Sequence, residues 1–300
     1  MSNSGFVLLD KIAGETSFKA LFPLKRVFST KRVGHAGTLD LRASGLIIAA
    51  TGRCTRLLPF VEAKDKCYSF RLHLGYETDT LEWDGEVVEQ GEQVAVTRED
   101  VERVLPQFTG DIEQIPPKYC AVKINGVRAS DLMERGRNIE LKPRKIRISE
   151  LKVIGEGEKT EDCSGKEFAT FDLICECSKG TYIHALGRDI GRALGTYACV
   201  SQIRRHRIGN VTLDKAVRGD ALTRENLLPV DAVLDFPVVR LTDEQVATIR
   251  QGNWLPWKAK IEGVGPEGHV FAANEQGEVL SLCFYEPGRI KPKFYLGEDD

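Results

Sequence analysis

Residues 34–50 read GHAGTLDLRASGLIIAA, and they place a glycine-bearing loop directly before an apolar run. Gly34 and Gly37 lie three residues apart, which lets the backbone approach a ligand closely. A single carboxylate, Asp40, ends the loop. The loop is not a Walker phosphate loop, because Gly37 is not followed by lysine at the required place. Taken alone, the pattern favours a tight turn with a capping aspartate and assigns no function.

Strands and helices alternate irregularly around this loop. Gly5 to Leu9 indicates a short strand, and Cys67 to Leu74 alternates like a half-buried strand with Arg71 and His73 on its polar face. Ser17 to Phe28 repeats apolar residues at helical spacing. The regular strand–helix–strand rhythm of a parallel sheet is absent. We therefore expect an α+β domain around a mixed, mostly antiparallel sheet.

Short motifs predict where several elements begin or turn. Thr51 can cap the helix that follows it, and Thr97-x-x-Asp100 resembles a capping box for another. Asp84-Gly85 is a hairpin signal. The chain also divides by composition: residues 1–238 are expected to form the main domain, with a basic segment at 118–147, and residues 239–300 a small appended β-rich domain.

Composition excludes several classes of protein. The chain has 300 residues, of which 42% are apolar and 29% charged, as in ordinary globular proteins. It contains no apolar run of about 18 residues that would span a membrane, and its start lacks the blocks of a signal peptide, so a cytoplasmic protein is expected. The net charge of −2 argues weakly against a polyanion partner. A local basic patch can nevertheless attract phosphates over about a Debye length.

The cysteines predict no metal site. Eight are scattered along the chain, and only Cys175 and Cys177 lie close together. A strand would point both of these thiols to one face. Their C-x-C spacing is not a zinc spacing, and no cluster of histidines joins it. Buried, reduced thiols are expected, with no metal and no cofactor.

Three further stretches carry residues suited to RNA. Tyr68 follows Lys64-Asp65-Lys66, and an aromatic face beside cations is a usual base-stacking arrangement, although a strand-borne aromatic is more often core. The sequence CSKGTYIH (177–184) runs from a strand into a helix whose start attracts anions. His184 would lie in the first helical turn, where a surface histidine without a role is the plainer interpretation. A dense basic run follows at 204–207.

Together these motifs resemble the TruB family of tRNA pseudouridine synthases. They run from Gly5 to about Gly209 in the family's order and spacing: GHAGTLD-x-x-ASGLI, GRCTRL, KDKCY, LGYETDT, PPKYCAVKINGVRA, CSKGTYIHALGRDIG and IRR. The resemblance implies a pseudouridine synthase fold and likens residues 239–300 to a small PUA-like RNA-binding domain. It further implies that the chain isomerises uridine 55 in the TΨC arm of tRNA, without a cofactor and as a monomer.

The resemblance also implies roles for single residues. Asp40 would be the catalytic aspartate, and Tyr68 would stack on the target base and assist the final proton removal. His35 would help to hold the RNA arm open, and Ile203 would lie beside the base. Residues 118–147 would include an insertion that clamps the arm. The other residues expected to bind substrate are cations beside these motifs, namely Lys66, Lys179, Arg204 and Arg205.

Two departures from the family pattern fall at the expected site. Leu41-Arg42 follow Asp40 where the family has proline, and His184 stands where the family has an arginine that pairs with the aspartate. Histidine offers neither the fork nor the permanent charge of arginine. It can still donate one hydrogen bond to Asp40, so His184 is grouped with the catalytic residues. Slower turnover and a displaced arginine, such as Arg188 one turn on, both stay open.

Several mechanisms and functions also stay open. The target base must leave its stack, at a cost of a few kcal/mol. Asp40 could then act as a nucleophile on the sugar or on the base, or as the base of a glycal route. The alternative function is a tRNA-binding or tRNA-folding protein that lost its chemistry, with His184 as the only support. A guide-RNA-dependent relative is disfavoured because the chain lacks long extensions, and a glycoside hydrolase because no second carboxylate pairs with Asp40.

Overall fold

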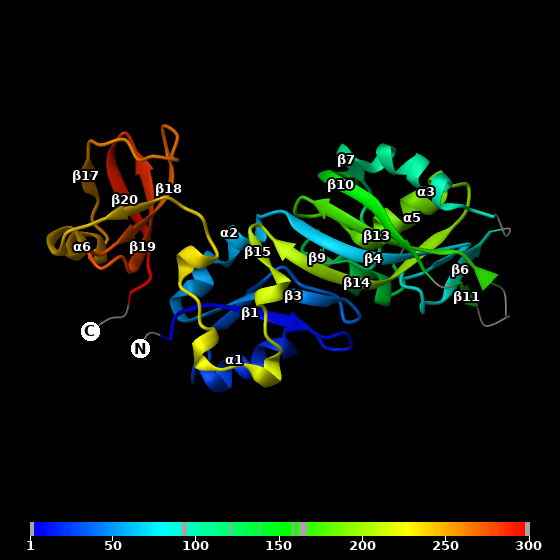
Figure 1. Ribbon diagram of the computed structural model, residues 1–300, viewed down its shortest axis with the longest axis horizontal. Helices are drawn as coiled ribbons and strands as arrows, with labels where there is room; N and C mark the ends of the chain where they lie inside the picture. The colour runs from blue at the N-terminus through cyan, green and yellow to red at the C-terminus, as the bar shows by residue number, and fades with distance from the viewer. Residues whose placement is uncertain are drawn as a thin grey trace.

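A nine-stranded sheet forms the centre of the molecule (Figure 1). The computed structural model describes residues 3–91, 95–120, 122–137, 139–157, 159–161 and 167–297. Its main strands, in sheet order, are β1 (Gly5–Lys11), β3 (Ser44–Thr51), β14 (Ala198–Ile208), β4 (Lys66–Leu74), β13 (Thr170–Cys177), β10 (Arg144–Glu156) and β7 (Gly110–Gln114). At the edges of this path, β2 (Val33–Ala36) pairs with β3, and β15 (Val211–Thr212) pairs with β14.

One pair of strands in this sheet is parallel. The pairing of β14 with β3 runs parallel, and the other pairings in the sheet are antiparallel. At this junction Gly45 has a φ of +100°, and a Cβ added to it would lie 2.3 Å from the carbonyl oxygen of Arg205. A larger residue would therefore push β14 away from β3. The expected α+β fold with a mixed, mostly antiparallel sheet is confirmed.

The helices are short and lie around the sheet. The longest, α5 (Ile183–Ala193), packs the buried side chains of Leu186 and Ile190 in the same core as Leu72 and Val200 of the sheet. The other helices are η1 (Lys19–Leu21), α1 (Phe22–Val27), η2 (Gly52–Leu57), α2 (Leu58–Glu62), α3 (Arg98–Val104), η3 (Leu105–Phe108), α4 (Ala129–Glu134), η4 (Leu213–Lys215), η5 (Gly219–Ala221), η6 (Arg224–Asn226), η7 (Val230–Ala232) and α6 (Asp243–Arg250).

The predicted caps had different outcomes. Thr97 and Asp100 form the expected capping box at the start of α3. The cap predicted at Thr51 is wrong: this hydroxyl donates instead to the carbonyl oxygen of Asn3 at 2.6 Å, and no side-chain cap is made. The helix predicted over Ser17 to Phe28 begins later and forms two pieces, with Pro23 in the first turn of α1.

The strand β4 is buried on more of its surface than its alternation indicates. His73 was expected to point to solvent, but its side chain is buried and lies 2.7 Å from the hydroxyl oxygen of Ser201. The prediction failed because the connection between β5 (Tyr76–Thr78) and β6 (Val87–Gln90) covers this face of β4. The ring of Trp83 stacks on that of His73 with centroids 6.1 Å apart, so a polar residue there needs a partner within the protein. Cys175 and Cys177 are buried as expected.

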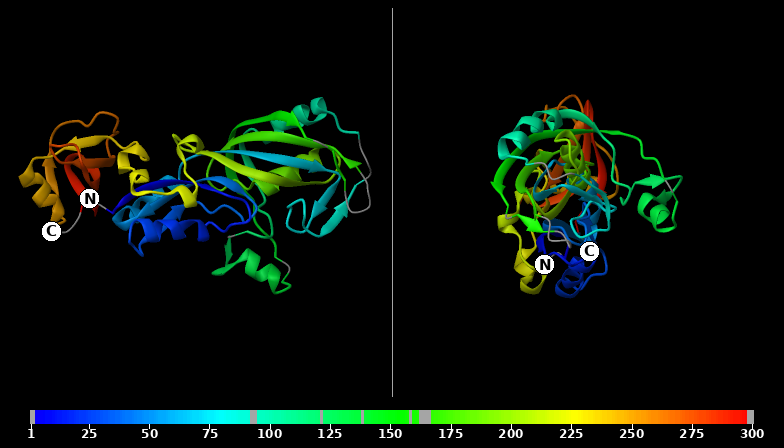
Figure 2. Two further views of the ribbon diagram at one scale, coloured as in Figure 1. Left: turned by 60° about the horizontal axis from the view of Figure 1, so that its bottom comes forward. Right: turned by 90° about the vertical axis from the view of Figure 1, so that its right-hand side faces the viewer.

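Three small strand pairs lie outside the central sheet in the part of the chain that the structure describes. The hairpin expected at Asp84-Gly85 is present, formed by β5 (Tyr76–Thr78) and β6 (Val87–Gln90). Another hairpin, β8 (Lys123–Ile124) with β9 (Val127–Arg128), leads into α4; Figure 2 shows this segment standing out from the body of the molecule. A third pair joins β11 (Thr160–Glu161) to β12 (Glu167–Phe168).

A separate five-stranded sheet lies at the C-terminal end of the chain and at one end of the elongated molecule (Figure 1). Its order is β16 (Val238–Arg240), β18 (Gly268–Ala273), β19 (Val279–Glu286), β20 (Gly288–Tyr295) and β17 (Leu255–Trp257). The ring of His269 packs against Phe60, Phe236 and Phe284, at centroid distances of 4.9, 5.6 and 5.3 Å. These contacts join the small sheet to α2 of the main body.

Arg53 holds both ends of the described chain. Its backbone N–H donates to the hydroxyl oxygen of Ser4 at 3.2 Å. Its guanidinium donates to the carbonyl oxygen of Gly297 at 2.6 Å. The residue lies in η2, directly after β3, so the first and last described segments meet beside the central sheet.

Candidate active site

The loop between β2 and β3 is fixed by side chains from three directions. Ser17 accepts a hydrogen bond from the backbone N–H of Leu39 and donates to its carbonyl oxygen, both at 2.9 Å. The Nη2 of Arg205 donates to the carbonyl oxygen of Gly37 at 3.0 Å. The ammonium of Lys11 donates to the carbonyl oxygen of Ala43 at 2.5 Å. The backbone on both sides of Asp40 is therefore held in place.

Gly37 is required by the shape of this loop. Its φ is +74°, a backbone conformation that side-chain-bearing residues rarely adopt. A Cβ added there would also lie 3.3 Å from the Nη1 of Arg205. The glycine spacing in the sequence thus reflects a real conformational need, which positions the following Asp40.

Asp40 opens into a cavity of about 650 Å³. Its side chain is 69% exposed. Of the residues predicted for the site, Asp40, Tyr68, His184 and Ile203 all line this cavity. They come from the β2–β3 loop, β4, α5 and β14, which are widely separated in sequence and adjacent in the folded sheet. The cavity also includes Arg128 from the protruding hairpin and Tyr182 from the start of α5.

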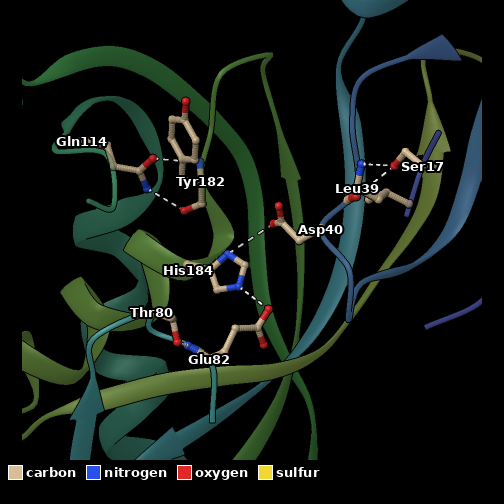
Figure 3. Close-up of polar contacts among 8 residues, drawn as sticks. All are labelled: Ser17, Leu39, Asp40, Thr80, Glu82, Gln114, Tyr182 and His184. Carbon is tan, nitrogen blue, oxygen red and sulfur yellow. Dashed lines mark hydrogen bonds and ion pairs between the residues drawn. The ribbon is translucent and has the colours of Figure 1, made fainter. Parts of the chain in front are cut away.

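His184 lies between two carboxylates (Figure 3). Its Nδ1 is 3.8 Å from Oδ2 of Asp40, and its Nε2 is 2.8 Å from Oε1 of Glu82. Burial by itself lowers the pKa of His184, but the hydrogen bond to Glu82 and the charges of Glu82 and Asp40 together outweigh it, so the pKa is raised. The imidazolium form is favoured at this position.

The start of α5 is fixed by a side chain from β7. Gln114 accepts a hydrogen bond from the backbone N–H of Tyr182 at 2.9 Å and donates to its carbonyl oxygen at 3.1 Å (Figure 3). Gln114 is buried, and Tyr182 is the N-cap residue of α5. This pair of hydrogen bonds sets where the first helical turn begins, and hence where His184 stands.

Glu82 is a site residue that sequence reasoning missed. It lies in the connection between β5 and β6, in the acidic stretch that was interpreted only as a hairpin. Its side chain is 17% exposed and lines the cavity. The available signal was weak, because one carboxylate among several in an acidic turn has no distinguishing spacing. Only the fold brings it to a histidine 102 residues further along the chain.

Tyr68 is the aromatic side chain of the cavity. It lies on β4, opposite Cys175 of β13 and Arg205 of β14. Burial raises the pKa of its hydroxyl, and this is opposed by the nearby Arg205. Tyr68 and the buried Ile203 therefore offer a flat ring and an apolar side chain beside the exposed carboxylate of Asp40.

Two of the predicted substrate-binding cations are engaged inside the protein. Arg205 is 1% exposed, and its Nε donates to the carbonyl oxygen of Leu46 at 2.7 Å in addition to its bond with Gly37. Lys66 is buried and donates to the carbonyl oxygen of Glu62. Burial lowers the pKa of Lys66 to about 8. Both side chains support the fold around the cavity and do not line it.

The other three residues predicted to bind substrate lie outside the cavity lining. Arg204 donates to Oδ2 of Asp10 at 2.8 Å. His35 is half-buried on β2, and burial followed by the charge of Arg205 lowers its pKa. Lys179 is exposed in the turn before α5. The structure thus brings Asp40, Tyr68 and His184 together in one cavity, while Arg204, His35 and Lys179 lie outside its lining.

An ion pair lies at the rim of the cavity. Arg42, near the position where a proline was expected, forms an ion pair with Asp84 of the β5–β6 connection. This pair links the loop that carries Asp40 to the turn that carries Glu82. Arg42 is 58% exposed, so the link is worth little energetically and remains accessible to a competing anion.

A larger hollow of about 1040 Å³ lies elsewhere, between the β5–β6 hairpin, the end of α5 and the segment near the protruding hairpin. Its lining includes the ion pair of Arg192 with Glu77, at 3.0 Å. Asp40, Tyr68 and His184 do not line it. The smaller cavity is therefore the candidate active site, because an exposed carboxylate, an aromatic ring and an imidazole line it together.

Within the described residues, no group of three or more His, Cys, Asp or Glu is arranged to hold a metal ion. None of the described helices is long and apolar enough to cross a membrane.

Known proteins resemble this chain along nearly its whole length. The family model described as TruB family pseudouridylate synthase (N terminal domain) matches residues 25–183. A protein of Caulobacter sp. (strain K31) named tRNA pseudouridine synthase B is 36% identical over 303 residues, which cover 96% of this chain and 94% of that protein. One of the same name from Bradyrhizobium diazoefficiens is 38% identical, covering 96% and 84%.

Solved structures share the fold. An H/ACA ribonucleoprotein bound to a substrate RNA containing 2′-deoxyuridine contains a chain with a TM-score of 0.72 and 19% identity, covering 99% of this chain and 86% of that one. An archaeal box H/ACA Nop10–Cbf5 complex gives a TM-score of 0.69, 19% identity and coverages of 99% and 87%. At 19% identity the likeness shows only that the fold is shared. The inferences about chemistry rest on the residues of the cavity.

Proposed function

The chain belongs to the TruB family of pseudouridylate synthases, and we propose that it converts uridine 55 in the TΨC arm of tRNA to pseudouridine, with Asp40 as the catalytic carboxylate. Its relatives are named tRNA pseudouridine synthases, and their names give no support to the alternative of a tRNA-binding protein without chemistry. We further propose that the enzyme acts as a cytoplasmic monomer.

The observation that carries this proposal is the convergence of three groups on one cavity. The exposed carboxylate of Asp40 faces the cavity from the glycine loop, with the imidazole of His184 behind it. Tyr68 supplies a ring on which an extruded uracil can stack, and stacking on one aromatic ring is worth roughly 1–3 kcal/mol. This gain offsets the cost of a few kcal/mol for removing the base from its stack.

The reaction needs one anionic group at the glycosidic bond. Asp40 acts at the sugar, at the base, or as the base of a glycal route, and each of these routes uses the same exposed oxygen atoms. The imidazole of His184, whose Nδ1 lies 3.8 Å from Oδ2 of Asp40, would orient this carboxylate. After the uracil has rotated and rejoined through carbon, a proton must leave that carbon. We assign assistance in this step to Tyr68, whose hydroxyl belongs to the same cavity.

RNA is expected to approach over the basic segment 118–147. This segment contains nine lysines and arginines against three acidic residues. The cations are exposed, and they are Lys118, Lys123, Arg128, Arg135, Arg137, Lys142, Arg144, Lys145 and Arg147. Since Arg128 also lines the cavity, the basic surface reaches the place where the target nucleotide would enter. We propose that this segment clamps the RNA arm.

The C-terminal domain also carries exposed cations. Its exposed cations are Lys258, Lys260, Arg289, Lys291 and Lys293. We propose that residues 239–300 form a PUA-like domain that contacts the tRNA outside the TΨC arm, while residues 1–238 carry the chemistry. The contacts of His269 with Phe60 and Phe236 would hold the two surfaces in a defined relation.

The test is the variant Asp40→Asn, assayed on in vitro transcribed tRNA by carbodiimide labelling and primer extension, which maps pseudouridine to single nucleotides. We expect product at one position in the TΨC arm with the wild type and none with the variant. The matched control is Asp220→Asn, which removes a carboxylate that is 73% exposed and does not line the cavity. Full activity of Asp40→Asn, or modification only outside the TΨC arm, contradicts the proposal.

A further inference from the structure

We propose that Arg42 is a substrate-binding residue: its guanidinium leaves Asp84 when RNA docks and binds one of the two phosphates that flank the extruded uridine. The inference rests on the proposed function, because it names a contact between the same cavity and its RNA. It assigns a role to a residue that stands where the sequence departs from the family pattern, two positions after Asp40.

The position of Arg42 is set by the loop that carries Asp40. The backbone N–H of Ala43 donates to the carbonyl oxygen of Asp40 at 3.2 Å. Leu41 and Arg42 therefore lie at the tip of a tight bend, and both are exposed. The carbonyl oxygen of Leu41 accepts from the backbone N–H of Gly14 at 2.8 Å, which ties this bend to the segment after β1. Since the backbone is held, the guanidinium of Arg42 moves by rotation of its side chain.

The ion pair of Arg42 with Asp84 is weak enough to be exchanged. The two side chains are 58% and 26% exposed, and exposed pairs contribute little to stability. The turn that carries Asp84 has its own support, because Oδ1 of Asp79 accepts from the backbone N–H groups of Thr80 and Glu86, at 2.8 and 3.0 Å. Both ends of the pair are thus held without it, so a competing anion can take Arg42 while the turn stays in place.

The charges around the cavity require a cation for an incoming phosphate. Three carboxylates line it, those of Asp40, Glu82 and Asp84. Among the described lining residues, the lysines and arginines are Arg42 and Arg128. An extruded nucleotide brings a phosphate on each side, and the carboxylates would repel both. The two arginines come from separate segments, the Asp40 loop and the protruding hairpin (Figure 2), so each can meet a different phosphate.

The chemistry of the guanidinium suits this exchange. Its planar fork donates two parallel hydrogen bonds to a carboxylate or to a phosphate, so Arg42 replaces one anion by another without losing its bonds. The ribose of the extruded nucleotide is bonded directly to both flanking phosphates. A phosphate held two residues from Asp40 therefore also fixes the sugar beside the proposed catalytic carboxylate, which orients the glycosidic bond for reaction.

Filter binding of a TΨC stem-loop RNA at several salt concentrations tests the role of Arg42. All proteins carry Asp40→Asn, so that the RNA stays unmodified, and the Asp40→Asn protein is the parent. We expect Arg42→Gln to weaken binding about 5–10-fold and to reduce the slope of log affinity against log salt concentration by about 1. The matched control is Arg218→Gln, which removes an arginine that is 60% exposed, is paired with Asp220 and lies outside the cavity lining. It should bind as the parent does.

The variant Asp84→Asn separates phosphate binding from a structural role of the ion pair. Asn-Gly forms the same turns as Asp-Gly, so this change keeps the turn at Asp84-Gly85. It removes the anion that competes for Arg42, and we expect the RNA to bind at least as tightly as to the parent. If the pair were only a structural link, Asp84→Asn and Arg42→Gln would weaken binding equally, and that result overturns the inference.

Neutral methylphosphonate linkages identify the phosphate. One such linkage is placed on the 5′ side and then on the 3′ side of the target uridine in the same stem-loop. At one of the two positions, the loss of affinity seen with the parent should vanish with Arg42→Gln, because the contact to that charge is already gone. Equal losses for both proteins at both positions overturn the inference. Failure of the proposed function gives a different result, namely wild-type protein that makes no pseudouridine in the TΨC arm.

Discussion

Replacing Arg205 by lysine should destabilise the protein and disturb the site at the same time. The guanidinium is 1% exposed and donates to two carbonyl oxygens, those of Leu46 at 2.7 Å and Gly37 at 3.0 Å. Lysine keeps the charge but carries a single ammonium in place of a planar fork. One of the two carbonyls then loses its donor, since the two acceptors are bonded by different nitrogen atoms.

The size of the effect follows from that lost bond. A hydrogen bond to a charged group contributes about 1.5–3 kcal/mol to the free energy of unfolding. For a domain of this size, 1 kcal/mol lowers Tm by roughly 2–4 °C, so we expect a decrease of about 3–12 °C. If the lost bond is the one to Gly37, the loop before Asp40 loosens, and a displacement of about 1 Å at a reacting group can reduce turnover up to ~100-fold.

Thermal unfolding followed by circular dichroism, together with single-turnover rates on tRNA, measures both effects. The control is Arg204→Lys on the same strand, because Arg204 is 37% exposed and its main partner is Asp10. We expect that change to cost less than about 1 kcal/mol. A Tm for Arg205→Lys equal to that of the wild type or of the control would refute the reasoning that this buried cation holds the loop.

Three further changes test other parts of the site. Gly37→Ala should lower turnover and destabilise the protein by about 1 kcal/mol or more, because alanine is strained at a φ of +74°. Parallel measurements of Tm and rate check this, and a variant with unchanged Tm and rate contradicts it. Tyr68→Phe should keep tRNA binding and lose turnover. Tyr68→Leu should also weaken binding, because the stacking ring is lost. Equal rates for Tyr68→Phe and the wild type would contradict the proton-transfer role assigned to Tyr68. A triple variant should weaken tRNA binding and reduce its salt dependence, with an unchanged rate at saturating tRNA; its changes are Arg135→Ala, Arg137→Ala and Lys142→Ala. Filter binding at several salt concentrations measures this. An unaltered slope of log affinity against log salt concentration argues against phosphate contacts there.

Local sequence signals predicted the features that depend on local geometry. Gly37 was interpreted as letting the backbone approach a ligand closely; the structure shows that its φ of +74° is a conformation that favours glycine. Thr97 and Asp100 form their capping box because both partners lie within one helical turn. His184 falls in the first turn of α5 for the same reason. The irregular order of the expected strands and helices was enough to predict a mixed, mostly antiparallel sheet.

The features that were missed depend on strand order. Glu82 reaches His184 only because its turn is bonded to Val200 on β14, and no spacing in the sequence records that contact. Arg205 was predicted to bind substrate because it lies in a basic run, but the pairing of β14 between β3 and β4 turns its side chain inward. His73 is buried because Trp83, from the connection between β5 and β6, stacks on its ring. Neighbouring charges in a sequence thus need not share a surface in a sheet.

Because the first and last described segments meet at Arg53, the order in which the segments are synthesised is separable from the architecture they form. A short glycine-serine linker from Gly297 to Ser4 would close the backbone into a ring, and new ends could be opened at the exposed Asn125-Gly126 turn of the protruding hairpin. Such a circular permutant would retain the whole central sheet. It would place its free ends beside the RNA, where a fluorophore could report docking directly.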